Sequence, residues 1–355
     1  MTKPKIRIKD IAEMAGVSKG TVDRVLHNRG EVSEESLRKV KKVLREMNYE
    51  PNVYASALAS KRTYRFLCLL PQHAESDYWA QVEAGVVKQA AELRDLGVSL
   101  ERIYFDQYDM YACQSLFESV AIRECDGVVL APLFKEPSLM LARTLMARTI
   151  PVVFVDSHVA DARILAYYGM DSACSGKLAA TLLLAEHPDI KDVVMFHLAR
   201  RGESEANQTR LRREGFMEYV REQRPRLTVH SLALSWNDRE GNTLLLDRFF
   251  AEHPEVKAGL TFNSRAYMIA EYLNLRSKSD FRLLGYDLLE GNVGALKAGH
   301  VSYLIAQRPE QQGYHGLRAL AQSLIFHQKP AELNLMPMDI LTKENIDFYL
   351  NFPSI

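Results

Sequence analysis

The sequence lacks the features that mark several classes of protein. It has only four cysteines in 355 residues, widely spaced and without a C-x-x-C pair, which is typical of reduced thiols in a cytoplasmic protein. The N-terminus, MTKPKIRIKD, has no apolar signal core, and no apolar run is long enough to span a bilayer. We therefore expect a soluble, cytoplasmic protein with no membrane partner.

Catalytic signatures are also missing. The sequence contains no G-x-S-x-G elbow, H-E-x-x-H pair or G-x-G-x-x-G turn, and its ten histidines are scattered. Residues 169–177, GMDSACSGK, superficially resemble a phosphate-binding loop, but the glycine spacing is wrong and Leu178 replaces the required Ser or Thr. The sequence therefore predicts no catalytic residue, no metal site and no cofactor, and we expect the protein not to be an enzyme.

The chain has no net charge, but its charges are unevenly placed. It carries 45 basic and 45 acidic side chains, yet residues 1–65 have a net charge of +7 and the remainder a net charge of −7. A length of 355 residues suggests two or three domains. A basic head on an acidic body is typical of a polyanion-binding module joined to a domain with another task.

Residues 8–28, IKDIAEMAGVSKGTVDRVLHN, predict two short helices around a tight turn. Gly16 is placed to end the first helix, and Ser18 can cap the second. The apolar residues recur at helical spacing in both, while the second helix exposes Lys19, Thr21 and Arg24. This pattern is that of a helix-turn-helix whose second helix enters the major groove, and an ordinary helical hairpin is the less favoured alternative.

Two further features complete the head. Ser33 can cap a third helix that closes a three-helix core. After the break at Pro51, Asn52 can cap residues 53–60, VYASALAS, which hold one large aliphatic side chain, Leu58. This segment is too short to be a stable helix alone, so a plain interdomain linker is the alternative interpretation.

From residue 65 onward, short apolar runs alternate with amphipathic stretches of helical length. The runs expected to be strands are residues 66–70, 103–105, 127–131, 152–155, 193–196, 260–262, 283–285 and 303–306. Apolar strands joined by helices predict parallel sheets covered on both faces, and there are enough units for two Rossmann-like subdomains. Because ligands bind beyond the carboxyl ends of such strands, the polar residues that follow them are candidate ligand contacts.

A specific set of residues runs through the head and the segment after it: Asp10-Ile11-Ala12, Ala15-Gly16-Val17-Ser18, Thr21-Val22, Arg24-Val25-Leu26, Val32-Ser33, Asn48-Tyr49, Pro51-Asn52, Ala55, Leu58 and Ala59. The body carries more diffuse markers, which include Ile150-Pro151-Val152-Val153 and Leu284-Gly285-Tyr286-Asp287. In these residues the sequence resembles the LacI/GalR family of bacterial transcription regulators, most specifically in the head and the segment after it.

The resemblance implies an α/β architecture in three parts. These are a helix-turn-helix domain (residues 1–50), a hinge helix or linker (51–63) and an effector domain of periplasmic-binding-protein type (64–355). Within the effector domain we expect an N-subdomain of residues 64–166 and 309–330 and a C-subdomain of residues 167–308 and 331–355. Crossover segments near residues 165–169, 307–309 and 329–331 would act as the hinge between them.

The resemblance also implies a homodimer that binds double-stranded DNA at a near-palindromic operator. The hinge would become helical only on DNA, where Leu58 would wedge between base pairs. Gly20 offers no side chain, and Asp23 and His27 depart from the common serine and asparagine, so the operator is expected to differ from those of relatives. The implied DNA contacts are Ser18, Lys19, Gly20, Thr21, Arg24, His27, Asn28, Ser33, Asn52, Ala55, Leu58 and Ala59.

A cleft that binds a carbohydrate needs aromatic faces together with carboxylates, amides and guanidinium groups. The candidate ligand contacts of this kind are Tyr78, Trp79, Asp156, Arg212, Asn263, Asp287 and Gln307. Four of them have a plain structural alternative, since Trp79 could be core, Asn263 and Asp287 could cap helices, and Arg212 could be a solvated charge.

We expect a repressor of carbohydrate-utilisation genes that a sugar or sugar derivative relieves. A nucleoside or nucleobase acting as corepressor is the second choice. An anionic ligand held by Arg212, Arg265 and Arg308 is a further alternative. A sugar-modifying enzyme fused to a DNA-binding head is the weakest.

Overall fold

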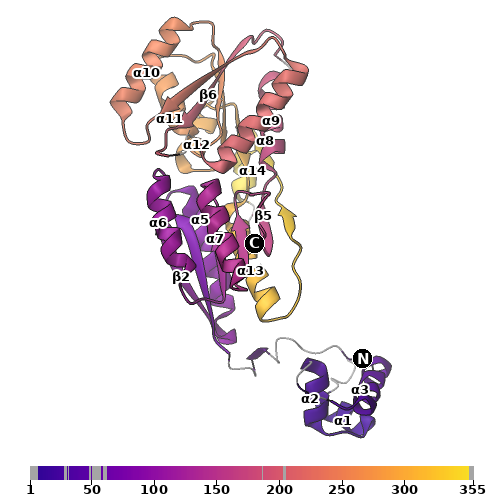
Figure 1. Ribbon diagram of the computed structural model, residues 1–355. Helices are drawn as coiled ribbons and strands as arrows, with labels where there is room; N and C mark the ends of the chain where they lie inside the picture. Colours follow the sequence, from indigo (N-terminus) through magenta and orange to yellow (C-terminus); the bar gives the residue numbers. More distant parts are fainter. Residues whose placement is uncertain are drawn as a thin grey trace. The chain divides into compact units, whose positions relative to one another are not determined.

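The computed structural model describes residues 7–27, 30, 32–47, 49, 57–58, 62–185, 187–202 and 205–351, without the side chain of His27. The chain divides into two compact units, residues 1–61 and 62–355 (Figure 1). The predicted DNA contacts Asn28, Asn52, Ala55 and Ala59, and the side chain of His27, lie outside the described residues.

The first unit contains the three expected helices. They are α1 (Ile8–Ala15), α2 (Lys19–His27) and α3 (Glu34–Glu46). Gly16 ends α1 in the left-handed conformation, with φ of +63°, which glycine adopts without the steric cost of a side chain. The helices bury one small apolar cluster, formed by Ile11, Ala12, Ala15, Val22, Val40 and Val43. The predicted helix-turn-helix and its third helix are therefore confirmed.

The second unit consists of two lobes, each built on a six-stranded sheet (Figure 1). In the N-lobe the strand order is β11-β5-β4-β3-β1-β2, and all pairs are parallel. The strands are β1 (Tyr64–Pro71), β2 (Val98–Phe105), β3 (Gly127–Leu130), β4 (Val152–Val155), β5 (Ala166–Gly169) and β11 (Leu333–Leu335). Helices α5 and α13 pack on one face, and α6 and α7 on the other. Their bounds are α5 (Tyr78–Glu92), α6 (Met110–Ala121), α7 (Lys135–Ala147) and α13 (Pro309–Leu324), with a short 3₁₀ helix, η1 (Arg94–Leu96), after α5.

The C-lobe repeats this plan with the order β12-β10-β9-β8-β6-β7, in which only β12 is antiparallel to its neighbour. Its strands are β6 (Asp192–Leu198), β7 (Thr228–Leu234), β8 (Ala258–Thr261), β9 (Arg282–Tyr286), β10 (Tyr303–Ala306) and β12 (Asp339–Leu341). Separate apolar clusters lie under α8 and α9 on one face and under α10, α11 and α12 on the other. The helices are α8 (Ser172–Leu184), α9 (Asn207–Gln223), α10 (Arg239–Glu252), α11 (Ala266–Leu275), α12 (Glu290–Lys297) and α14 (Ile346–Asn351).

Glycines let the helices α5 and α13 of the N-lobe approach closely. A Cβ added to Gly85 of α5 would lie 1.9 Å from the Glu310 carbonyl oxygen, and one on Gly313 of α13 would lie 2.0 Å from that of Val82. Larger residues at these positions would force the two helices apart.

The structure corrects the expected boundary between the lobes. β5 and β11 pair with each other in the N-lobe sheet, so residues 167–169 and 333–335, which we expected in the C-subdomain, belong to the N-lobe. The chain crosses between lobes at residues 170–171, 307–308 and 336–338. The expected crossovers at residues 165–169, most of which form β5, and at residues 329–331 were therefore wrong. The sequence pattern also missed β7, because only Leu234 of its residues is buried and the strand lies at the sheet edge.

Candidate functional site

The exposed surface of α2 in the first unit carries the predicted base-reading residues. Lys19, Gly20 and Arg24 are exposed, whereas Val22 is fully buried in the head core. The Thr21 amide donates to Ser18 Oγ at 3.0 Å, and the two hydroxyls lie 2.9 Å apart, so these residues cap the helix. The arrangement leaves a cationic, solvent-facing side on a helix that is fixed from behind by apolar packing.

Two other predicted DNA contacts are placed at the surface of this unit. Ser33 is exposed and accepts a hydrogen bond from the Ser36 amide at 3.4 Å, so it caps α3 as expected. The side chain of Leu58 is 55% exposed. A large aliphatic side chain in water is unfavourable, and contact with a partner surface would remove that cost.

In the second unit, five of the seven predicted ligand contacts lie together in one buried polar network between the lobes. The five are Tyr78, Asp156, Arg212, Asp287 and Gln307, each no more than 6% exposed. Tyr78 and Asp156 come from the N-lobe, Arg212 and Asp287 from the C-lobe, and Gln307 from a crossover segment. The structure thus brings together residues that are more than 200 positions apart in the sequence.

Direct hydrogen bonds join these five residues into two groups, Tyr78 with Asp156 and Gln307 with Asp287 and Arg212. The Tyr78 hydroxyl donates to Asp156 Oδ1 at 2.8 Å, and Gln307 Nε2 donates to Asp287 Oδ1 at 2.8 Å. Arg212 donates from Nη2 to Gln307 Oε1 at 3.3 Å and from Nη1 to the Phe262 carbonyl at 2.6 Å. Because these groups already bond to one another, a ligand that enters must replace bonds within the network.

The two aspartates occupy equivalent places in the two lobes. Asp156 follows β4, which is the third strand from the β11 edge of the N-lobe sheet. Asp287 follows β9, which is the third strand from the β12 edge of the C-lobe sheet. Both adopt the left-handed conformation, with φ of +70° and +67°, which aspartate tolerates better than most residues. Each amide donates to the neighbouring strand at 3.0 Å, Asp156 to Tyr168 and Asp287 to Ile305.

Burial dominates the electrostatics of the network. Removal from water raises the pKa of Asp156 to about 6 and that of Asp287 to about 7, although Arg212 opposes both shifts. The guanidinium of Arg212 is fully buried and lies 3.9 Å from the centre of the Tyr286 ring. The network therefore combines one cation, two acids that titrate near neutrality, an amide and a phenol.

The other two predicted ligand contacts, Trp79 and Asn263, lie outside the hydrogen-bonded network. The Trp79 ring is nearly buried and meets the Tyr78 ring edge to face, with centroids 5.0 Å apart. It therefore packs against the network through the Tyr78 ring. Asn263 Oδ1 accepts a hydrogen bond from the Arg265 amide at 2.8 Å. This bond forms a local turn before α11. The N-cap residue of α11 is Arg265, so the alternative in which Asn263 caps this helix was wrong. Neither residue makes a hydrogen bond within the network in the described part of the chain.

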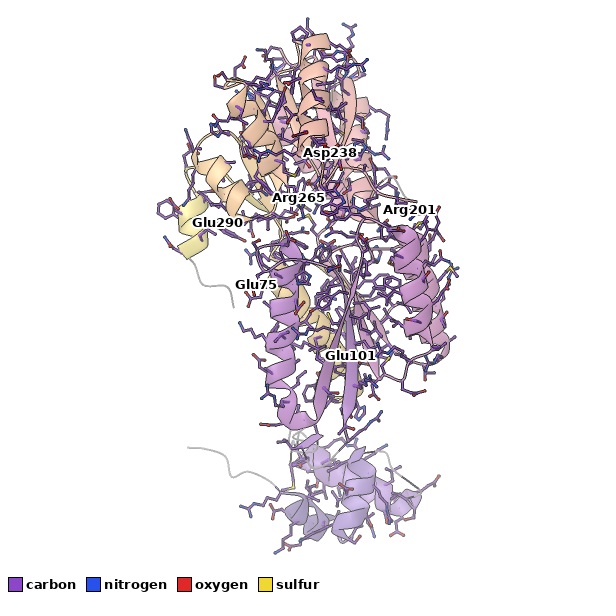
Figure 2. All side chains as sticks on the ribbon, turned by 90° about the vertical axis from the view of Figure 1, so that its left-hand side faces the viewer. Glu75, Glu101, Arg201, Asp238, Arg265 and Glu290 are labelled. Carbon is purple, nitrogen blue, oxygen red and sulfur yellow. The ribbon has the colours of Figure 1, made fainter. Side chains whose placement is uncertain are left out.

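A second set of contacts joins the lobes at the ends of β2 and β6. The Tyr108 ring of the N-lobe stacks on Trp236 of the C-lobe, with centroids 4.7 Å apart and planes 9° apart. Arg201 pairs with Asp109 at 3.0 Å, and its backbone forms a short β-bridge with the same residue. Arg265 lies 3.8 Å from Asp77, and Figure 2 shows Arg201 and Arg265 at the boundary between the lobes.

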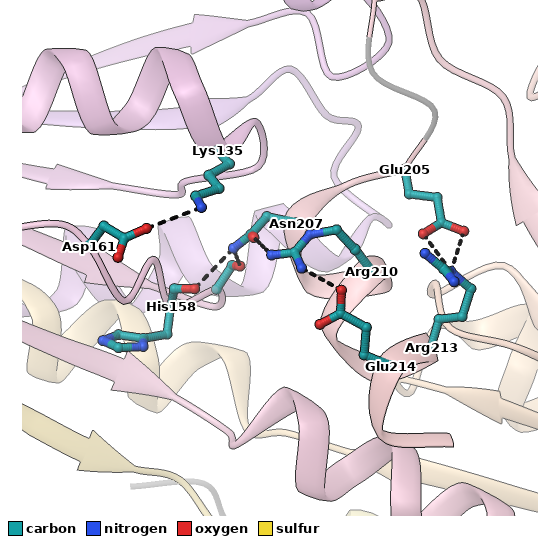
Figure 3. A network of polar contacts seen from close by, with 9 residues as sticks. Lys135, His158, Asp161, Glu205, Asn207, Arg210, Arg213 and Glu214 are labelled. Carbon is teal, nitrogen blue, oxygen red and sulfur yellow. Dashed lines mark hydrogen bonds and ion pairs between the residues drawn. The ribbon is translucent and has the colours of Figure 1, made fainter. Parts of the chain in front are cut away.

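Sequence reasoning missed two residues at the start of α9 that also bridge the lobes. Gln208 Nε2 lies 2.8 Å from Asp156 Oδ1 and 3.2 Å from Gln307 Oε1, so it connects the two halves of the network. Asn207 Nδ2 donates to Ser157 Oγ at 2.6 Å and to the His158 carbonyl at 3.0 Å (Figure 3). Their position at the start of the helix after β6 was the available signal.

The arginines proposed for an anionic ligand already face carboxylates. Arg308 donates to both oxygens of Asp339, at 2.8 and 3.1 Å, and Arg265 lies near Asp77. Arg212 shares its charge with two buried acids. This arrangement disfavours a phosphate and suits a neutral ligand rich in hydroxyl groups, which both donate and accept hydrogen bonds.

A helix-turn-helix head on a two-lobed unit with a polar site between the lobes defines the class of ligand-responsive DNA-binding regulators. Residues 7–52 match the model of the bacterial regulatory proteins of the lacI family, and residues 67–328 match the periplasmic binding protein domain. The chain therefore belongs to the lacI family of bacterial regulatory proteins, with an effector unit of the periplasmic binding protein type. Among the described residues, no helix is both long and apolar enough to cross a membrane.

Two curated relatives illustrate the range of similarity. The HTH-type transcriptional regulator DegA of Bacillus subtilis is 30% identical over 152 residues, which are 42% of this chain and 44% of that protein. The ribose operon repressor of Haemophilus influenzae is 25% identical over 291 residues, 80% of this chain and 82% of that protein. The match thus spans less than half of the first relative and most of the second.

A solved structure shows the similarity of the second unit. A protein of Bacteroides fragilis assigned as a LacI transcriptional regulator is 40% identical and superposes with a TM-score of 0.77, over 81% of this chain and all of that one. GanP, a glucose-galactose binding protein of Geobacillus stearothermophilus, is 24% identical with a TM-score of 0.70, over 81% of this chain and 99% of that one. The second likeness shows the fold alone.

Proposed function

We propose that the protein is a transcription regulator that represses carbohydrate-utilisation genes until a neutral sugar or sugar derivative binds between its lobes. The observation that carries the proposal is the buried network of Tyr78, Asp156, Gln208, Asp287 and Gln307, in which carboxylate oxygens face phenol and amide donors. Sugar hydroxyls can replace each of these partners without adding charge. The names of the curated relatives, among them ribose and sucrose operon repressors, support this choice.

The exposed face of α2 is the proposed reader of the operator. Arg24 has the donor geometry for two hydrogen bonds to a guanine, and Lys19 is suited to a phosphate or a base edge. Since a single short helix makes few base contacts, we propose that a homodimer presents two such helices to a near-palindromic site. Leu58 would then insert into the minor groove between the half-sites and bend the DNA.

Ligand binding would act on DNA through the separation of the lobes. Gln208 bridges Asp156 of the N-lobe and Gln307 of the crossover, so a ligand that takes over either bond changes the free energy of closure. A ligand shifts such an equilibrium only by its difference in affinity for the two states. The lobe motion would thereby alter how the two heads of a dimer are presented to the operator.

The test starts by selecting operator sequences for the full chain from a pool of random duplex DNA. Operator affinity is then measured with and without neutral monosaccharides, sugar phosphates and nucleosides. We expect a neutral sugar to weaken operator binding at least tenfold. A nucleoside that strengthens binding would instead support corepression, and indifference of the selected operator to every class of ligand would overturn the proposal.

A pair of head variants tests the proposed reader. Arg24→Ala should weaken binding to the selected operator by about 1–3 kcal/mol, since it removes a base-reading cation. Lys9→Ala, which removes an exposed cation paired with Glu13 on α1, is the matched control and should have a smaller effect. Equal losses in the two variants would contradict the assignment of Arg24 as a base contact.

A further inference from the structure

Two histidines and two carboxylates gather in the C-lobe at the ends of its strands opposite the polar network. Asp192 is the first residue of β6, and His230 lies near the start of the neighbouring edge strand β7. His253 is the C-cap residue directly after α10, and Glu255 follows two residues later. Three different elements therefore bring together four side chains that the sequence separates by up to 63 positions.

The distances among these side chains are those of a compact ligand set. One ring nitrogen of each histidine and one carboxylate oxygen of Glu255 all lie within 4.8 Å of one another. His253 Nδ1 is 3.2 Å from Glu255 Oε1, and His230 Nε2 is 3.3 Å from Asp192 Oδ1. Ligand atoms about 2.0–2.1 Å from a tetrahedral zinc ion lie about 3.3–3.4 Å apart, which is close to both separations.

The surroundings hold the two imidazoles in place. The Phe249 ring lies against both, with centroids 5.5 Å from His230 and 5.0 Å from His253. The imidazole rings themselves are 4.4 Å apart. The two histidines and Asp192 are partly buried, and only Glu255 is mostly exposed, so the group has a fixed inner side and an open outer side.

The charge pattern favours a cation as the missing partner. In the described part of the chain, the ion pairs recorded for Asp192 and Glu255 are with these histidines, whereas the nearby Asp247 and Glu252 pair with arginines. Neither carboxylate is therefore recorded in an ion pair with a lysine or an arginine among the described residues, so its negative charge lacks that compensation. A divalent ion bound by two imidazoles and a carboxylate supplies that compensation.

We propose that His230, His253 and Glu255 form a binding site for a divalent transition metal such as zinc, separate from the site between the lobes. Asp192 completes it, either as a fourth ligand or by orienting the His230 ring through its hydrogen bond. The bound ion would tie the edge strand β7 to the end of α10. This proposal does not depend on which ligand the polar network binds.

Titration of the tag-free, metal-stripped full chain with Co²⁺ and then with Zn²⁺ tests the site. We expect one equivalent of Co²⁺ to bind with the visible absorption bands of a four- or five-coordinate ion, and Zn²⁺ to displace it. Zn²⁺ should also raise the midpoint of thermal unfolding, because it binds the folded state.

Single-site variants locate the binding. His230→Gln and His253→Gln should each weaken Co²⁺ affinity at least tenfold, while circular dichroism reports an unchanged fold. His300→Gln, which changes a partly exposed histidine elsewhere in the same lobe, is the matched control and should bind as the parent does. Failure of the parent to bind either ion, or equal affinity in all three variants, would overturn the proposal.

Discussion

The two lobes of the second unit share one plan, yet they supply different chemistry at matching positions. The helix that follows the fifth strand of each sheet order, β1 in one and β6 in the other, begins with Tyr78-Trp79 in α5 and with Asn207-Gln208 in α9. The N-lobe thus supplies aromatic rings where the C-lobe supplies amides. A site that needs both a hydrophobic face and hydrogen-bonding groups is assembled from one repeated scaffold.

The two aspartates also differ in the hydrogen-bond donors around them. Asp156 accepts hydrogen bonds from a donor of each lobe, Tyr78 and Gln208, whereas Asp287 accepts from Gln307 alone among the described side chains. Fewer donors leave the Asp287 carboxylate less stabilised, which is consistent with its pKa of about 7 against about 6 for Asp156. Asp156 is therefore the aspartate whose bonds change most when the lobes separate.

The largest difference between the lobes is Arg212, because the equivalent helix of the N-lobe, α5, contains no arginine. Arg212→Leu should lower the free energy of unfolding by about 3–5 kcal/mol, because two buried acids lose their cation. Chemical denaturation of the full chain measures this loss. The neighbouring Arg213→Leu removes a pair with Glu205 and should cost less, because the Arg213 side chain is 40% exposed and Arg212 is fully buried. Similar losses in the two variants would contradict the central place of Arg212.

Removing the amide that bridges the lobes should have the next largest effect. Gln208→Ala takes a donor from Asp156 and should lower the free energy of unfolding by about 1–3 kcal/mol. Because this bond crosses between lobes, small-angle scattering should also show a larger radius of gyration. Gln223→Ala, at the exposed end of the same helix, is the control. An unchanged scattering profile for Gln208→Ala would show that the bond does not hold the lobes together.

The two aspartates should also be distinguishable by pH. Between about pH 4 and pH 7 the folded protein holds protons that the unfolded chain has released, so the free energy of unfolding should fall as pH rises. Each additional bound proton contributes a slope of about 1.4 kcal/mol per pH unit. Asp287→Asn should flatten the decline over the whole range from about pH 4 to pH 7, whereas Asp156→Asn should flatten only the part below about pH 6. Denaturation curves at several pH values measure both slopes, and identical profiles in the two variants would refute the assignment.

The smallest expected effect concerns the aromatic stack between the lobes. Tyr108→Leu should cost about 0.5–1.5 kcal/mol, because it removes the partner of Trp236. The chain has only two tryptophans, so in a Trp79→Phe background the fluorescence reports Trp236 alone. We expect a red-shifted emission in Tyr108→Leu. The same emission with and without Tyr108 would mean that the stack is not populated in solution.

Much of the architecture was predictable because its signals are local. The capping residues Gly16, Ser18 and Ser33 and the apolar strand cores follow rules that act within a few residues, and the structure confirms them. The place of β5 and β11 in the N-lobe sheet was not predictable, because each strand is short and its neighbours along the chain do not show which sheet it joins. Pairing partners of this kind are set by the whole fold.

In the candidate site, too, the sequence predicted the residues at strand ends but not a contact between distant parts of the chain. Tyr78, Asp156, Asp287 and Gln307 were predicted from the rule that ligands bind beyond strand ends, and the structure places them in one network. Gln208 was missed because an amide at the start of a helix is common and its target, Asp156, is 52 positions away. Asn263 satisfied the rule but makes a local turn instead, because its side chain reaches its own backbone first.

The measurement that tests the account most directly is calorimetric titration of the full chain with neutral monosaccharides, compared between the parent and Asp156→Asn, Asp287→Asn and Gln208→Ala. The account predicts that a sugar binds the parent and that each variant loses at least tenfold in affinity while the fold is retained. Sugar binding of unchanged affinity in all three variants would contradict the claim that the network between the lobes is the ligand site.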